Sequence, residues 1–262
     1  MDTWIEVLEK PKLKNPIFIE GLPGIGNVGR IVAGSLIEEL KAKKFAHLYS
    51  PYFSPFVLLQ NDVVHVLRNE FFYWQDPKGK NDLIILVGDC QSSEQGGFGH
   101  YEVAAKILDF VEGYGTKFIY TLGGFGTGEI EKDEPEVLGA VSDEKLMKEF
   151  GKYKINFEET SEKVGMIIGA TGLILGLGKL RGMDGVCLMG ETTGFPILTD
   201  PKAAKSVIKV LIEAIGLDIN LASLDGRVKE MKSFLKRLED IQMRAMKHQK
   251  ETVKKDELRY IG

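Results

Sequence analysis

Short apolar runs, each followed by a helix-like pattern, restrict the folds open to this chain of 262 residues. Leu83–Val87 is apolar throughout, and Lys117–Thr121 and Gly185–Met189 repeat the pattern with few polar residues. Runs of this kind are typical of strands in a parallel sheet that helices cover on both faces. Helical spacing follows over His100–Val111 and Pro201–Ile215. The sequence therefore predicts an α/β fold, with functional loops at the carboxyl ends of the strands.

The first third of the chain adds a different pattern. Ile17–Ile19 is a short strand-like run that leads through Gly21–Gly29 into helical spacing from Ile31. Four short β-prone runs follow between Phe45 and Trp74, and Asn61-Asp62 supplies a two-residue turn between two of them. We expect this block to be antiparallel. Further along, Met166–Ile168 precedes a glycine-containing segment and is expected to add one more buried run.

From residue 224 onward the spacing changes to that of one long amphipathic helix. We therefore predict a core domain over residues 1–222 and a C-terminal helix and tail over residues 223–262. The tail carries eleven Lys or Arg against seven Asp or Glu, whereas the whole chain has a net charge of -4. Packing against its own sheet and packing against another chain both remain open for this helix. Its apolar stripe is the candidate oligomer contact, formed by Val228, Met231, Phe234, Leu235, Leu238 and Ile241.

Charge and cysteine content exclude several classes of protein. The small net charge predicts no nucleic-acid binding, and two isolated cysteines predict neither a disulfide framework nor a zinc knuckle. The four histidines lack the spacing of a metal site. The N-terminus has no leader pattern, and no apolar run approaches the roughly 20 residues that span a bilayer. We expect a cytoplasmic protein without membrane contact, cofactor or metal.

Glycine is in excess, with 30 residues in the chain. Gly24–Gly29 matches the G-x-G-x-x-G pattern of dinucleotide-binding loops between a predicted strand and helix. No acidic residue occurs between Glu39 and Asp62, so the carboxylate that would hold a ribose is missing. A tight strand-to-helix turn with close packing is the favoured interpretation.

A second glycine segment, Gly123–Gly128, follows a predicted strand and is a possible anion-binding nest, but it lacks the lysine of a phosphate-binding loop. A Cys90, His100 and Glu191 arrangement is conceivable, although a buried structural cysteine is favoured. The alternative function is therefore an enzyme of nucleoside or small-anion chemistry. Its pocket would be formed by Gly24, Gly26, Asp89, Thr127 and Glu191. No catalytic residue is assigned.

Taken in order, the glycine motifs carry a resemblance. Gly21–Gly29, Gly123–Gly128, and Gly169–Gly178 leading into Gly190–Gly194 resemble the proteasome assembly chaperone (PAC) family in its archaeal branch. The likeness extends over about residues 15 to 215. It implies a three-layer, phosphorylase-like α/β/α core, a homo-oligomer, and no established catalytic activity. It also implies an ATP-independent role in assembling or binding proteasome core subunits, or work with a related assembly factor.

The resemblance also directs attention to the C-terminus. Family members and other proteasome binders use a terminal hydrophobic-Tyr-any tripeptide that enters pockets between α-subunits. This chain ends in Leu258-Arg259-Tyr260-Ile261-Gly262, with Tyr260 third from the end and Arg259 at the hydrophobic position. The candidate partner-binding residues are therefore Leu258, Tyr260, Ile261 and Gly262, and a frayed terminus is the alternative.

Overall fold

The computed structural model describes residues 2–93, 97–128, 134–157, 165–194 and 199–219, together with residues 221 and 226. The chain divides into two compact units, residues 1–220 and 221–262, and the description below concerns the first unit. The predicted boundary at residue 222, the C-terminal helix with its stripe from Val228 to Ile241, and the tail from Leu258 to Gly262 lie outside the described residues.

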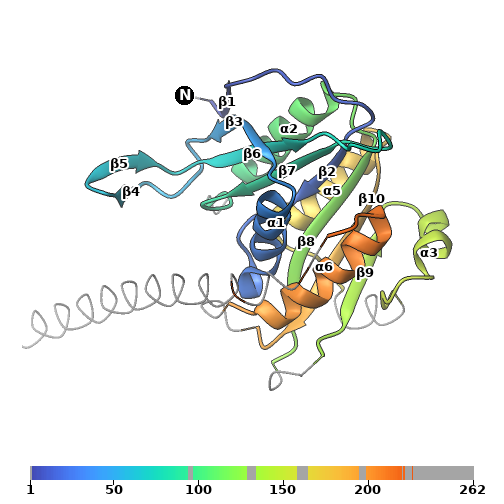
Figure 1. The fold of residues 1–262 in the computed structure, drawn as a ribbon. Coiled ribbons are helices and arrows are strands. Elements are labelled where there is room, and N and C mark those ends of the chain that lie inside the picture. Colours follow the sequence, from blue (N-terminus) through green and yellow to red (C-terminus); the bar gives the residue numbers. More distant parts are fainter. Residues whose placement is uncertain are drawn as a thin grey trace, which may run out of the picture. The chain divides into compact units, whose positions relative to one another are not determined.

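An eight-stranded mixed sheet is the centre of the first unit (Figure 1). Its order is β1-β3-β6-β7-β2-β8-β10-β9. The neighbours β7, β2, β8 and β10 run parallel, and the remaining pairs are antiparallel. In chain order the strands are β1 (Trp4–Val7), β2 (Ile17–Glu20), β3 (Lys43–Tyr49), β6 (Asn69–Trp74), β7 (Leu83–Gly88), β8 (Phe118–Gly126), β9 (Val137–Val141) and β10 (Asp184–Thr192).

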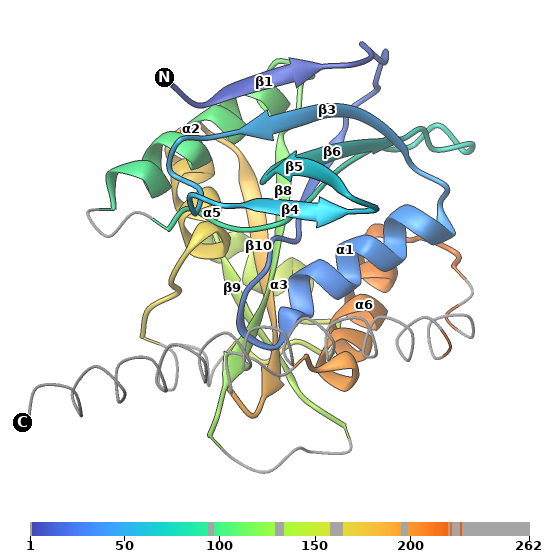
Figure 2. The same cartoon turned by 90° about the vertical axis from the view of Figure 1, so that its left-hand side faces the viewer.

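Helices cover both faces of this sheet, which confirms the predicted α/β fold (Figure 2). The helices α1 and α6 pack together on one face, and α2 and α5 pack together on the other. The short helix α3 lies beside β9. The helical elements are η1 (Ile25–Asn27), α1 (Val28–Glu39), α2 (Phe98–Glu112), α3 (Glu144–Phe150), α5 (Ala170–Leu180) and α6 (Pro201–Ile215).

The core explains why the apolar runs are continuous. Leu83, Ile84, Ile85 and Leu86 of β7 are all fully buried, because α1 covers one side of this strand and α2 the other. In the antiparallel half, Phe45 of β3 instead joins an aromatic cluster with residues of β6 and α2. Alternate residues of β3 and β6 face the opposite side of the sheet and are only half-buried.

The predicted hairpin is confirmed. The strands β4 (Val57–Gln60) and β5 (Val63–Val66) form a separate two-stranded sheet, joined by Asn61 and Asp62 with φ values of 50° and 64°. Positive φ at both central residues is the signature of a type I′ turn, which Asn and Asp tolerate well. In Figure 1 the hairpin projects beyond the ends of β3 and β6.

Two sequence predictions about local structure are wrong. Residues Gly123 to Gly126 do not form a loop after the strand, because β8 continues through them in parallel pairing with β10. Met166–Ile168 is not a buried run: Met166 is 72% exposed and Ile168 is 82% exposed. Apolar composition alone does not distinguish a buried strand from an exposed connection, because the difference depends on which surface the chain passes.

Candidate functional site

The four parallel strands present their carboxyl ends at one edge of the sheet, where α/β folds usually bind ligands. Glu20 ends β2, Asp89 follows β7, Gly126 ends β8 and Thr192 ends β10. The glycine segments of the sequence meet at this edge. The candidate site therefore lies where the sequence predicted functional loops.

Close backbone packing leaves no room for a side chain at two glycines of this edge. A Cβ atom on Gly29, in the first turn of α1, would overlap the carbonyl oxygen of Leu122 in β8. A Cβ atom on Gly124 would overlap the carbonyl oxygen of Ile25. Because a helix and a strand can approach this closely only without side chains, these glycines seat η1 and α1 on β8.

A buried carboxyl group lies beneath this packing. Glu20 is fully buried at the end of β2, and its Oε1 accepts a hydrogen bond of 2.8 Å from the backbone N–H of Leu22. Burial raises the pKa of Glu20 to about 7, although the nearby Thr171 hydroxyl and Leu122 backbone lower it in part. Even so, Oε2 has no partner with hydrogen-bond geometry in the described part of the chain. The buried position of Glu20 therefore favours its protonated form up to about neutral pH.

Cys187 lies close to this carboxyl group on β10. Its thiol is fully buried, and burial raises its pKa to about 12, with the Glu20 charge acting in the same direction. Cys90 follows β7 and is half-buried, and burial together with neighbouring Asp89 raises its pKa to about 12 as well. A thiol at such a pKa is protonated at neutral pH and is a poor nucleophile, so both cysteines have the character of packing residues.

The five residues of the alternative anion pocket do not all lie together in the structure. Gly26 accepts a hydrogen bond from the backbone N–H of Asp200, and the Thr127 N–H donates to the Thr192 carbonyl at 2.9 Å. Gly24 instead accepts a hydrogen bond from the Asn27 N–H. The backbone groups of Gly26 and Thr127 thus join neighbouring loops, whereas that of Gly24 closes its own turn.

The two carboxylates of that set also have backbone partners. Asp89 accepts a hydrogen bond of 3.1 Å from the Arg68 N–H, and it lies after β7, separated from β8 by β2. Buried Glu191 accepts a hydrogen bond of 3.3 Å from the N–H of Glu136, the residue immediately before β9. The structure brings Gly26 and Thr127 together around Thr192 and places Asp89 elsewhere.

An open cavity of about 310 Å³ lies between the N-terminal turns of α2 and α5. It is lined by His100, Ile167, Gly169, Gly172 and Leu173, and none of the five pocket candidates is among them. Beside the cavity, the Gln91 side chain accepts a hydrogen bond from the Ala170 N–H and donates one to the Pro23 carbonyl. This side chain links the loops after β2 and β7 to the start of α5.

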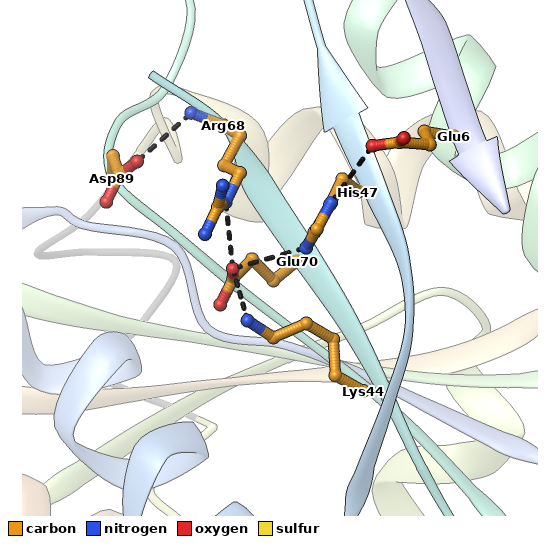
Figure 3. Close-up of polar contacts among 6 residues, drawn as sticks. All are labelled: Glu6, Lys44, His47, Arg68, Glu70 and Asp89. Carbon is orange, nitrogen blue, oxygen red and sulfur yellow. Dashed lines mark hydrogen bonds and ion pairs between the residues drawn. The ribbon is translucent and has the colours of Figure 1, made fainter. Parts of the chain in front are cut away.

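A charged cluster occupies the half-buried face of the antiparallel strands (Figure 3). Glu70 of β6 is its centre, and its Oε1 accepts hydrogen bonds from Lys44 Nζ at 2.6 Å and Arg68 Nε at 2.9 Å. Burial disfavours the ionised carboxyl group, but the two cations outweigh it and hold the pKa of Glu70 below its ordinary value. The side chain of Glu70 is therefore charged at neutral pH.

His47 extends this cluster toward β1. Its Nε2 lies 3.5 Å from Glu70 Oε1, at ion-pair distance but without hydrogen-bond geometry, and its Nδ1 lies 3.2 Å from Glu6 Oε2. Trp4 stacks on Tyr49 beside it, with ring centroids 5.1 Å apart. The face therefore combines charged groups with aromatic rings.

Replacing Glu70 by Gln is expected to lower the free energy of unfolding at pH 7 by roughly 1 kcal/mol, because two cations lose their shared counter-charge. The loss should shrink as the pH falls below about 4.5, the ordinary pKa of the carboxyl group, because the unfolded chain then binds a proton that folded Glu70, with its lowered pKa, does not yet bind. Urea denaturation at pH 7 and pH 3.5 measures both values. The matched control is Gln at Glu213, an exposed carboxylate of α6; an equal loss in the control would contradict the prediction.

Sequence reasoning missed Glu20 and Glu70. The signal available for Glu70 was a charged residue within the strand Asn69–Trp74, where burial alternates and Glu70 lies on the half-buried face. No comparable signal exists for Glu20, because a carboxyl group at a strand end is as often a solvent-exposed ligand as a buried residue. Within the described ranges, no group of three or more His, Cys, Asp or Glu residues is arranged to hold a metal ion.

Comparison with known proteins places the chain among relatives along nearly all of its length. A model of the PAC2 family matches residues 18–239. An uncharacterized protein of Methanocaldococcus jannaschii is 37% identical over 252 residues, which cover 95% of this chain and 93% of that protein. In the part of this chain that the structure describes, no helix has both the length and the apolar character needed to cross a bilayer.

Two crystal structures from Pyrococcus furiosus are similar in fold and in sequence. PbaB, an archaeal proteasome activator, has 46% identity and a TM-score of 0.82, with 91% of this chain and 99% of that chain covered. PbaA, an archaeal homolog of proteasome-assembly chaperone, has 28% identity and a TM-score of 0.72, with 93% and 99% covered. The fold is thus shared with these two proteins over more than nine-tenths of this chain.

Proposed function

Because the chain belongs to the PAC2 family, we propose that it acts as an ATP-independent proteasome assembly chaperone or adaptor. The observation that carries the proposal is the similarity to PbaB, a proteasome activator, over 91% of this chain at 46% identity. The carboxyl edge of the sheet supports a role through protein surfaces, because Gly29 and Gly124 are closely packed and the backbone groups of Gly26 and Thr127 join neighbouring loops.

The proposed protein is a cytoplasmic homo-oligomer whose partners are proteasome core subunits or a related assembly factor. The apolar stripe of the C-terminal segment, from Val228 to Ile241, supplies contacts between chains. The last residues, Leu258, Tyr260, Ile261 and Gly262, bind pockets between α-subunits through an apolar tip and the terminal carboxylate. Several such tails on one oligomer strengthen binding to a ring through multivalency.

Deleting residues 258–262 is expected to reduce binding to proteasome α-subunit rings at least a hundredfold, because each chain loses its apolar tip and the avidity of the oligomer is lost with it. Surface-immobilised archaeal α-rings, probed with the full-length and shortened proteins at equal concentration, measure the change. The native mass of the shortened protein should equal that of the full-length protein.

A matched substitution pair refines this test. Tyr260→Ala should weaken binding at least tenfold, whereas Glu257→Ala, just outside the proposed binding residues, should leave it within a factor of two. Unchanged ring binding after the deletion would reject the role of the tail. Absence of binding by the full-length protein would reject the proteasome as partner.

A further inference from the structure

The buried carboxyl group of Glu20 lies beneath the first turn of α5, residues 170–173. Glu20 is on the same side of β2 as Phe18, which belongs to a hydrophobic cluster with Ile174 of α5. Thr171, the second residue of α5, is buried next to Glu20, and its hydroxyl donates a hydrogen bond of 3.4 Å to the Leu122 carbonyl. This turn therefore covers the Glu20 side chain.

The carboxyl group has too few partners to hold a negative charge without water. Its Oε1 accepts the Leu22 N–H, but Oε2 has no hydrogen-bond partner and no Lys or Arg forms an ion pair with it in the described part of the chain. The titratable group that faces Glu20 is the thiol of Cys187, two strands away on β10, which supplies no positive charge. Because burying an uncompensated charge is strongly unfavourable, ionised Glu20 requires hydration.

Solvent reaches the outer side of the same turn. The open cavity of about 310 Å³ is lined by Gly169, Gly172 and Leu173, so the first turn of α5 separates this cavity from Glu20. The other routes are closed by larger elements, because β7 and β8 flank β2 and Gly29 seats α1 tightly on β8. Opening the turn is the smallest movement that admits water to the carboxyl group.

The turn is also weakly held. Gly169 begins it with a φ of 86°, and Gly172 lies within it, so it carries the low helix propensity of glycine. The chain that enters it has little packing, since Met166 is 72% exposed and Ile168 is 82% exposed. Few buried contacts mean a small free energy of local opening.

We propose that the first turn of α5 is a proton-controlled cover, which stays closed over protonated Glu20 and opens when Glu20 ionises, so that water from the cavity reaches the carboxylate. In the closed form burial raises the pKa of Glu20 to about 7, whereas a hydrated carboxyl group has the ordinary value of 4.5. Between these values opening releases the proton, and the open population rises by up to about tenfold per pH unit. This device does not depend on the proposed proteasome role.

Amide hydrogen exchange of the full-length protein measures the opening. The reporters are the Ala170 N–H, bonded to Gln91 Oε1, and the Leu173 N–H, bonded to the Gly169 carbonyl at 3.1 Å. After correction for intrinsic exchange rates, their protection should fall roughly fiftyfold from pH 5 to pH 8 in the wild type. It should stay nearly constant in Glu20→Gln, which cannot ionise.

The matched control variant is Glu213→Gln, at an exposed position of α6, which should behave as the wild type does. Circular dichroism verifies that both variants are folded. The control amide is the Ala204 N–H of α6, which is bonded to the Asp200 carbonyl and lies in another helix.

The outcomes distinguish local opening from global unfolding, which releases the same proton. A pH-dependent loss of protection that is confined to the first turn of α5 and absent in Glu20→Gln supports the proposal. An equal loss at Ala204 would mean that Glu20 is hydrated only when the whole domain unfolds, and it would overturn the proposal. Protection that does not change with pH in the wild type, or that falls equally in Glu20→Gln, also overturns it.

Discussion

Replacing Glu20 by Gln is expected to stabilise the protein relative to wild type as the pH rises. The difference in unfolding free energy, variant minus wild type, should be about 3 kcal/mol larger at pH 7 and above than at pH 4.5. Glu20 is fully buried, and burial raises its pKa from 4.5 to about 7. Between these values the unfolded chain has lost the proton that the folded protein keeps, so wild-type stability falls by about 1.4 kcal/mol per pH unit. The Gln side chain does not titrate, and its carbonyl oxygen can still accept the Leu22 hydrogen bond.

Chemical denaturation of both proteins at pH 5, 6, 7 and 8 measures this effect. The difference in unfolding free energy, Gln variant minus wild type, should rise up to about pH 7 and then remain constant. Any constant gain or loss from the altered packing cancels in this slope. Glu213→Gln, at an exposed position of α6, is the matched control. A difference that stays flat from pH 5 to pH 8 would show that Glu20 is ionised in the fold.

The second large effect is expected at Gly29. Replacing Gly29 by Ala should destabilise the protein by about 3 kcal/mol, although alanine favours a helix over glycine by nearly 1 kcal/mol. The added methyl group would overlap the Leu122 carbonyl oxygen, and relief requires α1 to move away from β8. The position of a Cβ atom is fixed by the backbone, and the carbonyl oxygen belongs to it. No side-chain rotation can therefore relieve the overlap.

Gly176 supplies the matched control for this substitution. It lies within α5 and is exposed, and, apart from its neighbours and the backbone of α5, no atom of the described residues lies within 4 Å of an added Cβ. Gly176→Ala should therefore stabilise the protein by up to about 1 kcal/mol through helix propensity alone. Thermal denaturation of the two variants and wild type measures both values. A neutral Gly29→Ala variant would mean that the helix and the strand tolerate a wider separation.

The sequence predicted the fold class well because the relevant signals are local. The continuous apolar run at Leu83–Val87 identified a strand buried on both faces, and Asn61-Asp62 identified the hairpin turn through the conformational tolerance of those residues. Prediction failed at Gly123–Gly126, where glycine composition indicated a loop. These residues extend β8, because pairing with β10 and the close approach of Ile25 stabilise an extended backbone.

Candidate site residues were harder to predict than secondary structure. The sequence offered Asp89, Thr127 and Glu191 as one group because each lies near the end of a strand. Strand order was not available from the sequence, and it places β2 between β7 and β8. Glu20 and Glu70 escaped attention for a related reason, since a carboxyl group acquires a shifted pKa from its surroundings in space.

By itself, the sequence determined that this chain forms an α/β sheet covered by helices, with glycine segments whose order resembles that of a known family. Those features depend on side-chain periodicity and on backbone freedom, which are properties of neighbouring residues. Only the tertiary structure decided which glycines hold a helix against the sheet, that Glu20 is buried, and that Val57, Leu59, Val64 and Val66 form one exposed face. Burial and cross-strand register arise when distant segments pack together, so no local pattern specifies them.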